Sequence, residues 1–332
     1  MVQLLRKIAF PFSLVYALVV HVRNFLYNIG VFVSKTYSTP TLCVGNLSVG
    51  GTGKTPMIEY LIRILEGHKV AVLSRGYKRT SKGFLLADSN SSVLDLGDEP
   101  FQIHQKFPKV SVAVDADRRN GMAQLESRVE PQVVLLDDAF QHRRVKPKYS
   151  ILLTAHDNLF VDDWYLPTGN LRDGKREYKR ADMIIVTKCP EVLSKDERHA
   201  ISKKLRLLPH QNVLFSSLMY DDYVKQKSGD SLALDALKGK RLALVTGIAS
   251  PGPLVKYLTT KGLLFEHFEF GDHHHFTNDE IKTFKDFELI LTTEKDYVRL
   301  EGRVENLYYL EVAHSFDSED RALLEKAVKG LL

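Results

Sequence analysis

The stretch 48–55 reads Ser-Val-Gly-Gly-Thr-Gly-Lys-Thr, and its residue types are those of a phosphate-binding loop. Its glycines let backbone N–H groups point inward, and a helix that begins behind such a loop attracts phosphate oxygens. The usual loop starts with glycine, where this chain has Ser48. An ordinary glycine-rich turn is the alternative, but a position between an expected strand at 41–46 and an expected helix at 56–67 favours a nucleoside triphosphate. The expected nucleotide contacts are Ser48, Gly50, Gly51, Thr52, Gly53, Lys54 and Thr55.

Two acidic residues after another expected strand complete the requirements of phosphoryl transfer. Asp137 and Asp138 follow the apolar residues 133–136, at the edge of a parallel sheet where ligands bind. In such sites the loop lysine reaches the β- and γ-phosphates, while the loop hydroxyl and an acidic residue hold Mg²⁺. We therefore expect Thr55, Asp137 and Asp138 to bind Mg²⁺, although aspartate pairs also cap the ends of strands.

Two further motifs contain groups that can move a proton. Gly97-Asp98-Glu99-Pro100 places two carboxylates before an expected helix, an arrangement that N-capping alone also explains. Residues 271–276 read Gly-Asp-His-His-His-Phe, and an acid beside an imidazole suits proton transfer. A solvated polar loop is the alternative for this second motif. Arg75, at the end of the expected strand 69–76, can clamp a phosphate through its guanidinium.

Short β-rich runs alternate with amphipathic stretches beyond residue 39, which is the pattern of an α/β protein. Continuous apolar runs indicate a parallel sheet covered on both faces. These runs lie at 41–46, 69–76, 109–115, 131–140, 149–156 and 181–188. A second set, at 241–248, 263–270, 288–295 and 306–313 with a helix near 253–262, indicates a smaller α/β unit. The polar stretch 223–231 is the best linker candidate, so we expect a P-loop domain at 36–225 and a C-terminal α/β domain at 226–332.

The first 35 residues differ from the rest of the chain. Residues 8–20 carry no charge and are flanked by Arg6, Lys7 and Arg23. This run is shorter than the roughly 20 residues of a membrane-spanning helix, and no small-residue cleavage site follows it as in a signal peptide. Interleaved aromatic and basic residues are typical of a helix that lies in a membrane surface, whereas a core helix explains the run equally well. We expect Pro11 near the start of a helix.

The composition narrows the classes of partner. The 332 residues include 46 Lys plus Arg against 41 Asp plus Glu, and this excess of +5 is too small to indicate nucleic acid. It suits a phosphorylated substrate or an anionic membrane surface. Two cysteines, Cys43 and Cys189, exclude a disulfide framework and indicate a reducing compartment. No nucleic acid and no obligatory protein partner are expected.

Seven motifs together resemble the tetraacyldisaccharide 4'-kinase family, the inner-membrane enzymes that phosphorylate the disaccharide precursor of lipid A. The motifs occur in the family's order over almost the whole chain, and the family's phosphate loop also lacks the usual first glycine, in agreement with Ser48. They are GNLSVGGTGKTP (45–56), SRGY (74–77), GDEP (97–100), DDAFQHRR (137–144), LPTGNLRD (166–173), GDHHHFT (271–277) and TTEKD (292–296). The chain departs from the family pattern at Lys78, Ala139, Asn170 and Asp173.

The resemblance implies a P-loop kinase that moves the γ-phosphoryl group of ATP, with Mg²⁺, to the 4'-hydroxyl of tetraacyldisaccharide 1-phosphate and makes lipid IVA. It implies that Asp98 is the catalytic base, that His273 pairs with this base, and that Glu99 lies near the Mg²⁺ held by Asp137 and Asp138. Since Asp98 and His273 fall in different expected domains, we expect domain closure to unite them. The acylated substrate implies that residues 1–35 form an interfacial helix at the cytoplasmic face of the inner membrane.

Two other interpretations use the same phosphate loop. One is a soluble P-loop phosphotransferase or ligase that acts on a small metabolite and needs no hydrophobic first segment. The other is a nucleotide-dependent switch. Residues 186–189, Val-Thr-Lys-Cys, are superficially similar to a guanine-binding loop, but Thr187 replaces its asparagine and Pro190 its aspartate. Formation of a bisphosphate from the disaccharide monophosphate separates all three interpretations.

Overall fold

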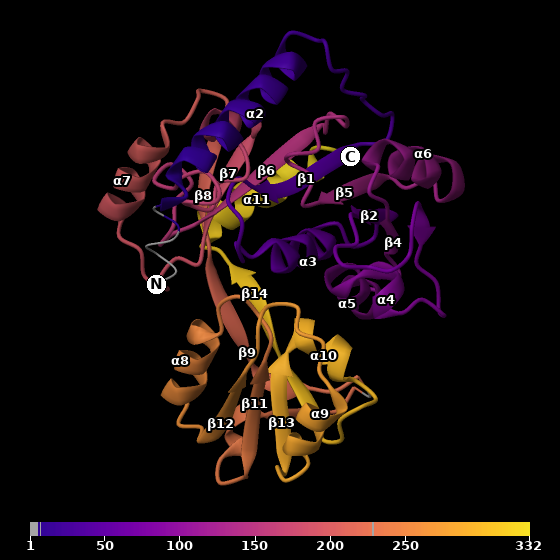
Figure 1. The fold of residues 1–332 in the computed structure, drawn as a ribbon, viewed down its shortest axis with the longest axis vertical. Helices are drawn as coiled ribbons and strands as arrows, with labels where there is room; N and C mark the ends of the chain where they lie inside the picture. Colours follow the sequence, from indigo (N-terminus) through magenta and orange to yellow (C-terminus); the bar gives the residue numbers. More distant parts are fainter. Residues whose placement is uncertain (1–5, 7, 228) are drawn as a thin grey trace.

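The computed structural model describes residue 6, residues 8–227 and residues 229–332. Within these residues the strands form two sheets, which lie in an upper and a lower unit in Figure 1. Lys7 and residues 1–5, which belong to the expected amino-terminal segment, lie outside the described residues. The prediction of a mostly parallel sheet with a second, smaller α/β unit is confirmed.

The first sheet has the strand order β3-β4-β2-β5-β1-β6-β7-β8. Its strands are β1 (Thr41–Asn46), β2 (Val70–Ser74), β3 (Leu85–Leu86), β4 (Ser111–Val114), β5 (Val133–Asp137), β6 (Tyr149–Ala155), β7 (Met183–Thr187) and β8 (Asn212–Phe215). All neighbours pair in parallel except the short edge strand β3. Every residue of β1, β2, β5 and β7 is buried, which explains their continuous apolar sequences.

Helices cover both faces of this sheet. They are α3 (Lys54–Ile64), α4 (Val93–Leu96), α5 (Asp98–Lys106), α6 (Arg118–Arg128), α7 (Lys195–Leu205) and α11 (Ser318–Lys329), with a 3-10 turn, η1, at Lys175–Arg180. One core cluster takes Met57 and Leu61 from α3 and Leu324 from α11. The cluster on the opposite face takes Met122 from α6 and Leu205 from α7. The sheet is therefore sandwiched between two apolar layers.

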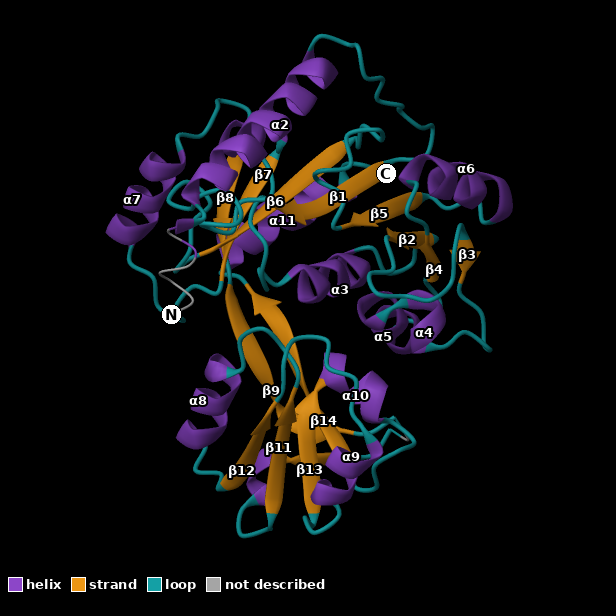
Figure 2. Cartoon of the chain, viewed as in Figure 1, coloured by secondary structure: helices purple, strands orange, loops and turns teal. Residues whose placement is uncertain are grey.

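The second sheet has the order β10-β9-β14-β13-β11-β12. Its elements, drawn in the lower half of Figure 2, are β9 (Ser217–Lys225), β10 (Ser231–Ala233), η2 (Leu234–Leu237), β11 (Leu242–Thr246), α8 (Gly252–Thr260), β12 (Phe265–Glu269), α9 (Asn278–Phe284), β13 (Leu289–Thr293), α10 (Glu294–Leu300) and β14 (Leu307–Ser315). Strands β12, β11, β13 and β14 are parallel, and β9 pairs antiparallel with β14 and β10.

The expectation of a linker at 223–231 is wrong. Tyr223 and Val224 pair with β10, and Lys225 pairs with Ser231, so this stretch belongs to a hairpin of the second sheet. Its polar composition reflects a hairpin turn at the sheet's edge instead of a connection between units. The chain crosses between the units elsewhere, once from β8 to β9 and once from β14 to α11. The division into units 1–35, 36–225 and 226–332 stays a prediction.

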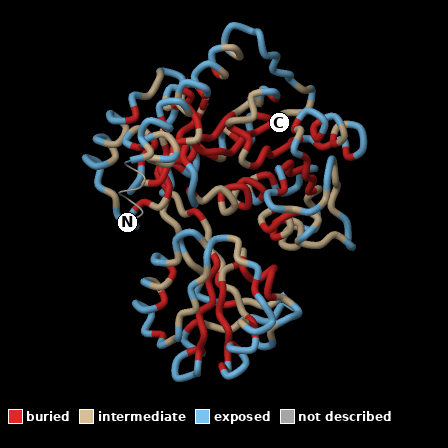
Figure 3. The backbone as a smooth tube through the Cα atoms, in the orientation of Figure 1, coloured by how far each residue is buried: buried red, intermediate tan, exposed pale blue. Residues whose placement is uncertain are grey.

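Helix α2 (Phe10–Asn28) runs over the outside of the first unit, and Pro11 lies in its first turn as predicted. Unlike a core helix, which buries its apolar face, α2 buries the polar residues Ser13 and Asn24. Most of its length is exposed or only partly buried (Figure 3). The large apolar side chains that it exposes are Phe10, Phe12, Leu14, Val15, Leu18, Val19, Val22 and Phe25. The interpretation of this segment as a core helix is therefore wrong.

Candidate active site

The phosphate loop joins β1 to α3 at the carboxyl end of the first sheet. Gly53 has a φ of 83° and is the N-cap of α3, a conformation that favours glycine. Helix α3 begins at Lys54, earlier than the range 56–67 expected from its apolar spacing, so Lys54 and Thr55 form its first turn. The Lys54 Nζ lies 3.3 Å from Asn46 Oδ1. Residues 48–52 line a pocket of about 160 Å³ together with side chains at the ends of β6 and β7.

The two predicted acidic residues lie beside this loop. Asp137 is the last residue of β5, which pairs with β1, and its Oδ2 accepts a hydrogen bond of 2.9 Å from Ser74 Oγ. Burial and the charge of Asp138 raise the pKa of Asp137 to about 6. Burial also raises the pKa of Asp138, but Lys54, 3.8 Å away, and Arg172 more than offset this and bring it to about 2. Both carboxylates are thus largely ionised at neutral pH.

Arg172 is a residue of this site that the sequence analysis did not single out. Its Nη1 donates to Asp138 Oδ2 over 2.9 Å, and its Nη2 contacts both Asp138 and Asn46. A bidentate contact of this kind between a guanidinium and a carboxylate fixes the orientation of the carboxylate. The available signal was its place in the motif 166–173, which the sequence analysis used only for the resemblance. Arg172 therefore joins Lys54 as a second cation beside Asp138.

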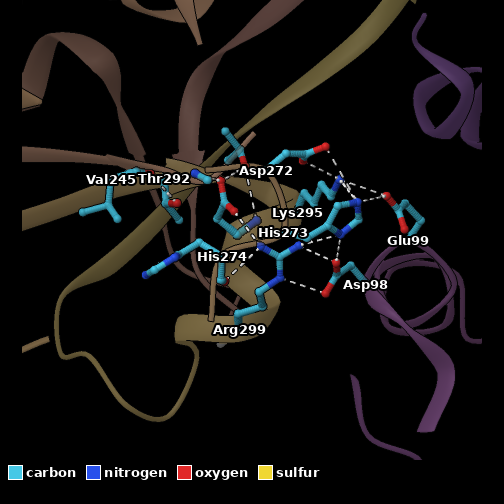
Figure 4. Close-up of polar contacts among 12 residues, drawn as sticks. Asp98, Glu99, Val245, Asp272, His273, His274, Thr292, Lys295 and Arg299 are labelled. Carbon is cyan, nitrogen blue, oxygen red and sulfur yellow. Dashed lines mark hydrogen bonds and ion pairs between the residues drawn. The ribbon is translucent and has the colours of Figure 1, made fainter. Parts of the chain in front are cut away.

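The second group of predicted residues meets between the two units (Figure 4). Asp98 is the first residue of α5, and His273 lies in the loop after β12, yet His273 Nδ1 is 2.5 Å from Asp98 Oδ2. The Asp98 carboxylate can only accept, so Nδ1 carries a proton and donates it to Asp98, while Lys295 Nζ lies 3.0 Å from His273 Nε2. The structure thus brings Asp98 and His273 together as the sequence analysis expects.

Two cations of helix α10 complete this group, and the sequence analysis assigned neither. Arg299 Nε donates to Asp98 Oδ1 over 2.8 Å, and its Nη2 contacts Asp98 Oδ2. Lys295 Nζ lies 3.0 Å from Glu99 Oε1. Lys295 stood in the motif 292–296, and Arg299 follows four residues later on the same helix face. Burial raises the pKa of Asp98, but hydrogen bonds from His273 and Arg299 more than offset it and hold that pKa well below its usual range.

Oxygen and nitrogen donors for a metal ion occur in both groups. Ligand atoms of Asp98, Glu99 and His273 lie within 4.8 Å of one another. Arg299 and Lys295 already neutralise these two carboxylates, so a further cation would have to displace an ion pair. Asp137 and Asp138, close to the hydroxyl-bearing first turn of α3, form a set of hard oxygen donors of the kind that Mg²⁺ prefers.

Close backbone packing joins the two groups on one side of the molecule. Ser74, which contacts Asp137, ends β2, and the chain continues through Arg75 to Tyr77. A Cβ at Gly97, the residue before Asp98, would lie 2.7 Å from the Tyr77 carbonyl oxygen, so only glycine fits there. The Tyr77 ring lies 5.3 Å from the ring of His273. Arg75 is exposed on this connection between the two groups.

Helix α2 contacts the segment that supplies Arg172. Ser13 Oγ donates to Thr168 Oγ1 over 2.8 Å, and Tyr16 donates its hydroxyl to the Arg172 carbonyl over 3.0 Å. Asn24 Nδ2 donates over 2.7 Å to Asp173 Oδ1, on a side chain with no exposed surface. Asp173 therefore has a defined role, which is to hold α2 against the first unit. The polar face of α2 thus fixes the helix to the site, and its apolar face is left outward.

Comparisons with known proteins bear on this arrangement. The family model described as tetraacyldisaccharide-1-P 4'-kinase matches residues 5–329. The tetraacyldisaccharide 4'-kinase of Flavobacterium johnsoniae is 48% identical over 321 residues, covering 95% of this chain and 94% of the relative. That of Bacteroides thetaiotaomicron is 46% identical over 316 residues, covering 89% and 83%. A crystal structure of LpxK from Aquifex aeolicus, described as an "apo" form in complex with ATP, matches with a TM-score of 0.80 and 30% identity, covering 98% of this chain and 99% of that one.

Proposed function

This chain belongs to the tetraacyldisaccharide 4'-kinase family, and we propose from its site geometry how its residues carry out the transfer. The protein is a kinase of lipid A biosynthesis that uses ATP to phosphorylate the 4'-hydroxyl of tetraacyldisaccharide 1-phosphate, which gives lipid IVA. The observation that carries our residue assignments is the contact of His273 with Asp98, close to the segment 74–77 that also contacts Asp137. The soluble phosphotransferase and the nucleotide switch are set aside.

The triphosphate binds at the start of α3 in our proposal. The backbone and hydroxyl groups of loop residues 48–53 surround the phosphates, and Lys54 contacts the β- and γ-phosphates. Arg75, exposed on the connection between the two groups, would contact the transferred phosphoryl group. Arg172, which contacts Asp138 beside the loop, would stabilise the negative charge that develops there.

Asp137, Asp138 and Thr55 would hold Mg²⁺, and their oxygen donors fit this ion. When bound, Mg²⁺ neutralises charge on the β- and γ-phosphates. Glu99 remains a proposed ligand that has to release Lys295 before it can contact the ion. The hydrogen bond from Ser74 fixes the orientation of the Asp137 carboxylate, and the charge of Lys54 keeps Asp138 ionised.

The Asp98–His273 pair accepts the proton of the sugar hydroxyl in our proposal. A hydroxyl is a poor nucleophile at neutral pH, and a positioned base commonly contributes about 10²- to 10⁴-fold in rate. A carboxylate held as strongly acidic as Asp98 is a weak base, so the Arg299 contact has to loosen as the substrate enters. His273 orients the carboxylate by donating Nδ1–H over 2.5 Å, and the proton of the sugar hydroxyl goes to the Asp98 carboxylate.

The substrate places the enzyme at a membrane, and α2 is the element suited to it. By length and composition α2 could cross a membrane. We propose that it lies in the cytoplasmic surface of the bacterial inner membrane, because its polar face is docked on the enzyme and its apolar face points outward. Docking to Asp173 and Arg172 then keeps the phosphate loop close to the lipid headgroup.

The direct test supplies the protein with ATP, Mg²⁺ and the acylated disaccharide monophosphate in detergent micelles. We expect a lipid bisphosphate from the wild type and from Lys69→Ala, which alters an exposed lysine outside the site. Lys54→Ala should make at least about 100-fold less product, since its ammonium contacts the transferred group. A wild type that makes no bisphosphate, or a Lys54→Ala variant with normal activity, would overturn the assignment.

A further inference from the structure

His314 has no part in the reaction described above, yet it contacts the phosphate loop. It lies on β14, close to the end of that strand, and only 4% of its surface is exposed. Its Nε2 lies 2.9 Å from the carbonyl oxygen of Gly53, and its Nδ1 lies 2.9 Å from Ser216 Oγ. A carbonyl oxygen only accepts, so Nε2 carries the proton and Nδ1 accepts from the Ser216 hydroxyl. Both ring nitrogens are therefore satisfied by a single neutral tautomer.

The surroundings keep this imidazole neutral. Burial lowers the pKa of His314 to about 4, and the contact with the Gly53 carbonyl only partly offsets this effect. A neutral ring with a fixed tautomer is a permanent N–H donor to the loop across the physiological pH range. The ring also leaves little room for a side chain at position 53, because a Cβ at Gly53 would lie 3.0 Å from His314 Nε2.

The contact determines the direction of a phosphate-binding group. In a trans peptide the C=O and the following N–H point in opposite directions. Fixing the Gly53 carbonyl toward His314 therefore directs the Lys54 N–H toward the phosphate side of the loop. The preceding carbonyl, that of Thr52, is held in the same way by Thr187 Oγ1 at 2.9 Å. Side chains behind the loop thus hold two successive peptide planes.

His314 also lies where the chain crosses between the units. Ser216 stands between β8 of the first sheet and β9 of the second, and His314 pairs with Leu218 in the β9–β14 ladder. Figure 1 shows β9 and β14 rising together from the lower unit toward α3. His273 belongs to the lower unit, as does β14. The strand that bears His314 therefore connects the unit of His273 to Gly53 in the phosphate loop.

We infer that His314 is a positioning residue, which holds the phosphate loop in its nucleotide-binding form and ties that form to the junction of the two units. The inference rests on the proposed nucleotide role of residues 48–55. No contact between His314 and substrate is required, because the imidazole acts through the Gly53 carbonyl.

The test compares His314→Leu with His314→Gln, whose amide N–H can replace Nε2–H. Loss of the N–H leaves a buried carbonyl with only its helical bond from the Met57 N–H, and about a tenfold rise in the KM for ATP is expected. The kcat and the KM for the lipid should stay within about twofold, and His314→Gln should restore the KM for ATP. Phe316→Leu is the matched packing control, since its ring packs against Tyr60 and lies 6.1 Å from the His314 ring but supplies no hydrogen bond to the loop. Its loss should lower Tm without raising the KM for ATP.

Equal KM values for ATP in the wild type and His314→Leu would overturn the inference, as would a His314→Gln variant as impaired as His314→Leu. If His314→Leu does not fold, His314→Asn takes its place, because its shorter amide does not reach Gly53. Equal KM values for the Asn and Gln variants would then overturn the inference. ATP binding by the wild type is measured alongside, and its absence would overturn the proposed nucleotide role of the loop instead.

Discussion

Replacing Lys106 by methionine should loosen the contact between the two units. The Nζ of Lys106, on α5, lies 2.7 Å from Glu59, 2.5 Å from Glu294 and 3.3 Å from Glu311. Glu59 belongs to the first unit, whereas Glu294 and Glu311 belong to the second. The exposed fractions of these four side chains lie between 2% and 20%, so solvent screens them little. One buried ammonium therefore holds three carboxylates from both sides of the interface.

The expected loss of stability follows from the removal of Lys106, the only cation within ion-pair distance of Glu294 among the described residues. Removing one partner of a buried ion pair costs about 3–5 kcal/mol. Burial and the charge of Glu59 already raise the pKa of Glu294, and without Lys106 this pKa rises further. A raised pKa in the fold means that the folded state binds the extra proton, so stability falls as pH rises from the ordinary glutamate pKa toward the raised value.

The assay is thermal unfolding of Lys106→Met and the wild type at pH 6 and pH 9. We expect a lower Tm for the variant at both values, with the larger loss at pH 9, where Glu294 has to ionise beside Glu59. Lys109→Met is the control, because it removes the same charge from an exposed lysine three residues further along the chain. A loss that is equal at both pH values, or equal for the two variants, would refute the reasoning.

Three further outcomes follow from the contacts of Arg172 and α2. Arg172→Met should lower kcat about 10- to 100-fold, because Asp138 loses a charge-assisted contact, and steady-state kinetics that show no loss would contradict its role. Leu18→Glu, on the exposed face of α2, should reduce flotation with anionic vesicles and leave Tm unchanged; undiminished flotation would count against a membrane-facing helix. Asn24→Leu should lower Tm and leave flotation unchanged, since Asp173 loses a buried partner worth about 1–3 kcal/mol while the apolar face is intact.

The local parts of the fold could be predicted from the sequence because their causes are local. The apolar runs of β1 and β5 are buried on both sides, and the glycines of the loop have the backbone freedom that its turn requires. The start of α3 was misplaced since Lys54 and Thr55 are polar and do not contribute to the apolar spacing. The stretch 223–231 was misassigned because polar residues suit a hairpin turn as well as a linker.

Contacts between distant segments were the harder part. Asp98 and His273 were found through their motifs, but Arg299 was not, because its pairing with Asp98 depends on the docking of α10 against α5. Arg172 was missed for the same reason, since its partner Asp138 lies on another loop. Likewise, nothing in the sequence of α11 indicates that it packs on the first sheet after the second has been completed. Such pairings exist only once both units are in place.

The central claim is that the Asp98–His273 pair acts on the sugar hydroxyl and not on the nucleotide. The decisive measurement is kcat for lipid bisphosphate formation beside the Kd for ATP, in Asp98→Asn and in His273→Gln. We predict a loss of about 10²- to 10⁴-fold in kcat for each variant, with ATP binding within about twofold of the wild type. His275→Gln, at an exposed histidine two residues away, should be unchanged in both quantities. Normal kcat in Asp98→Asn, or loss of ATP binding in both variants, would contradict the account.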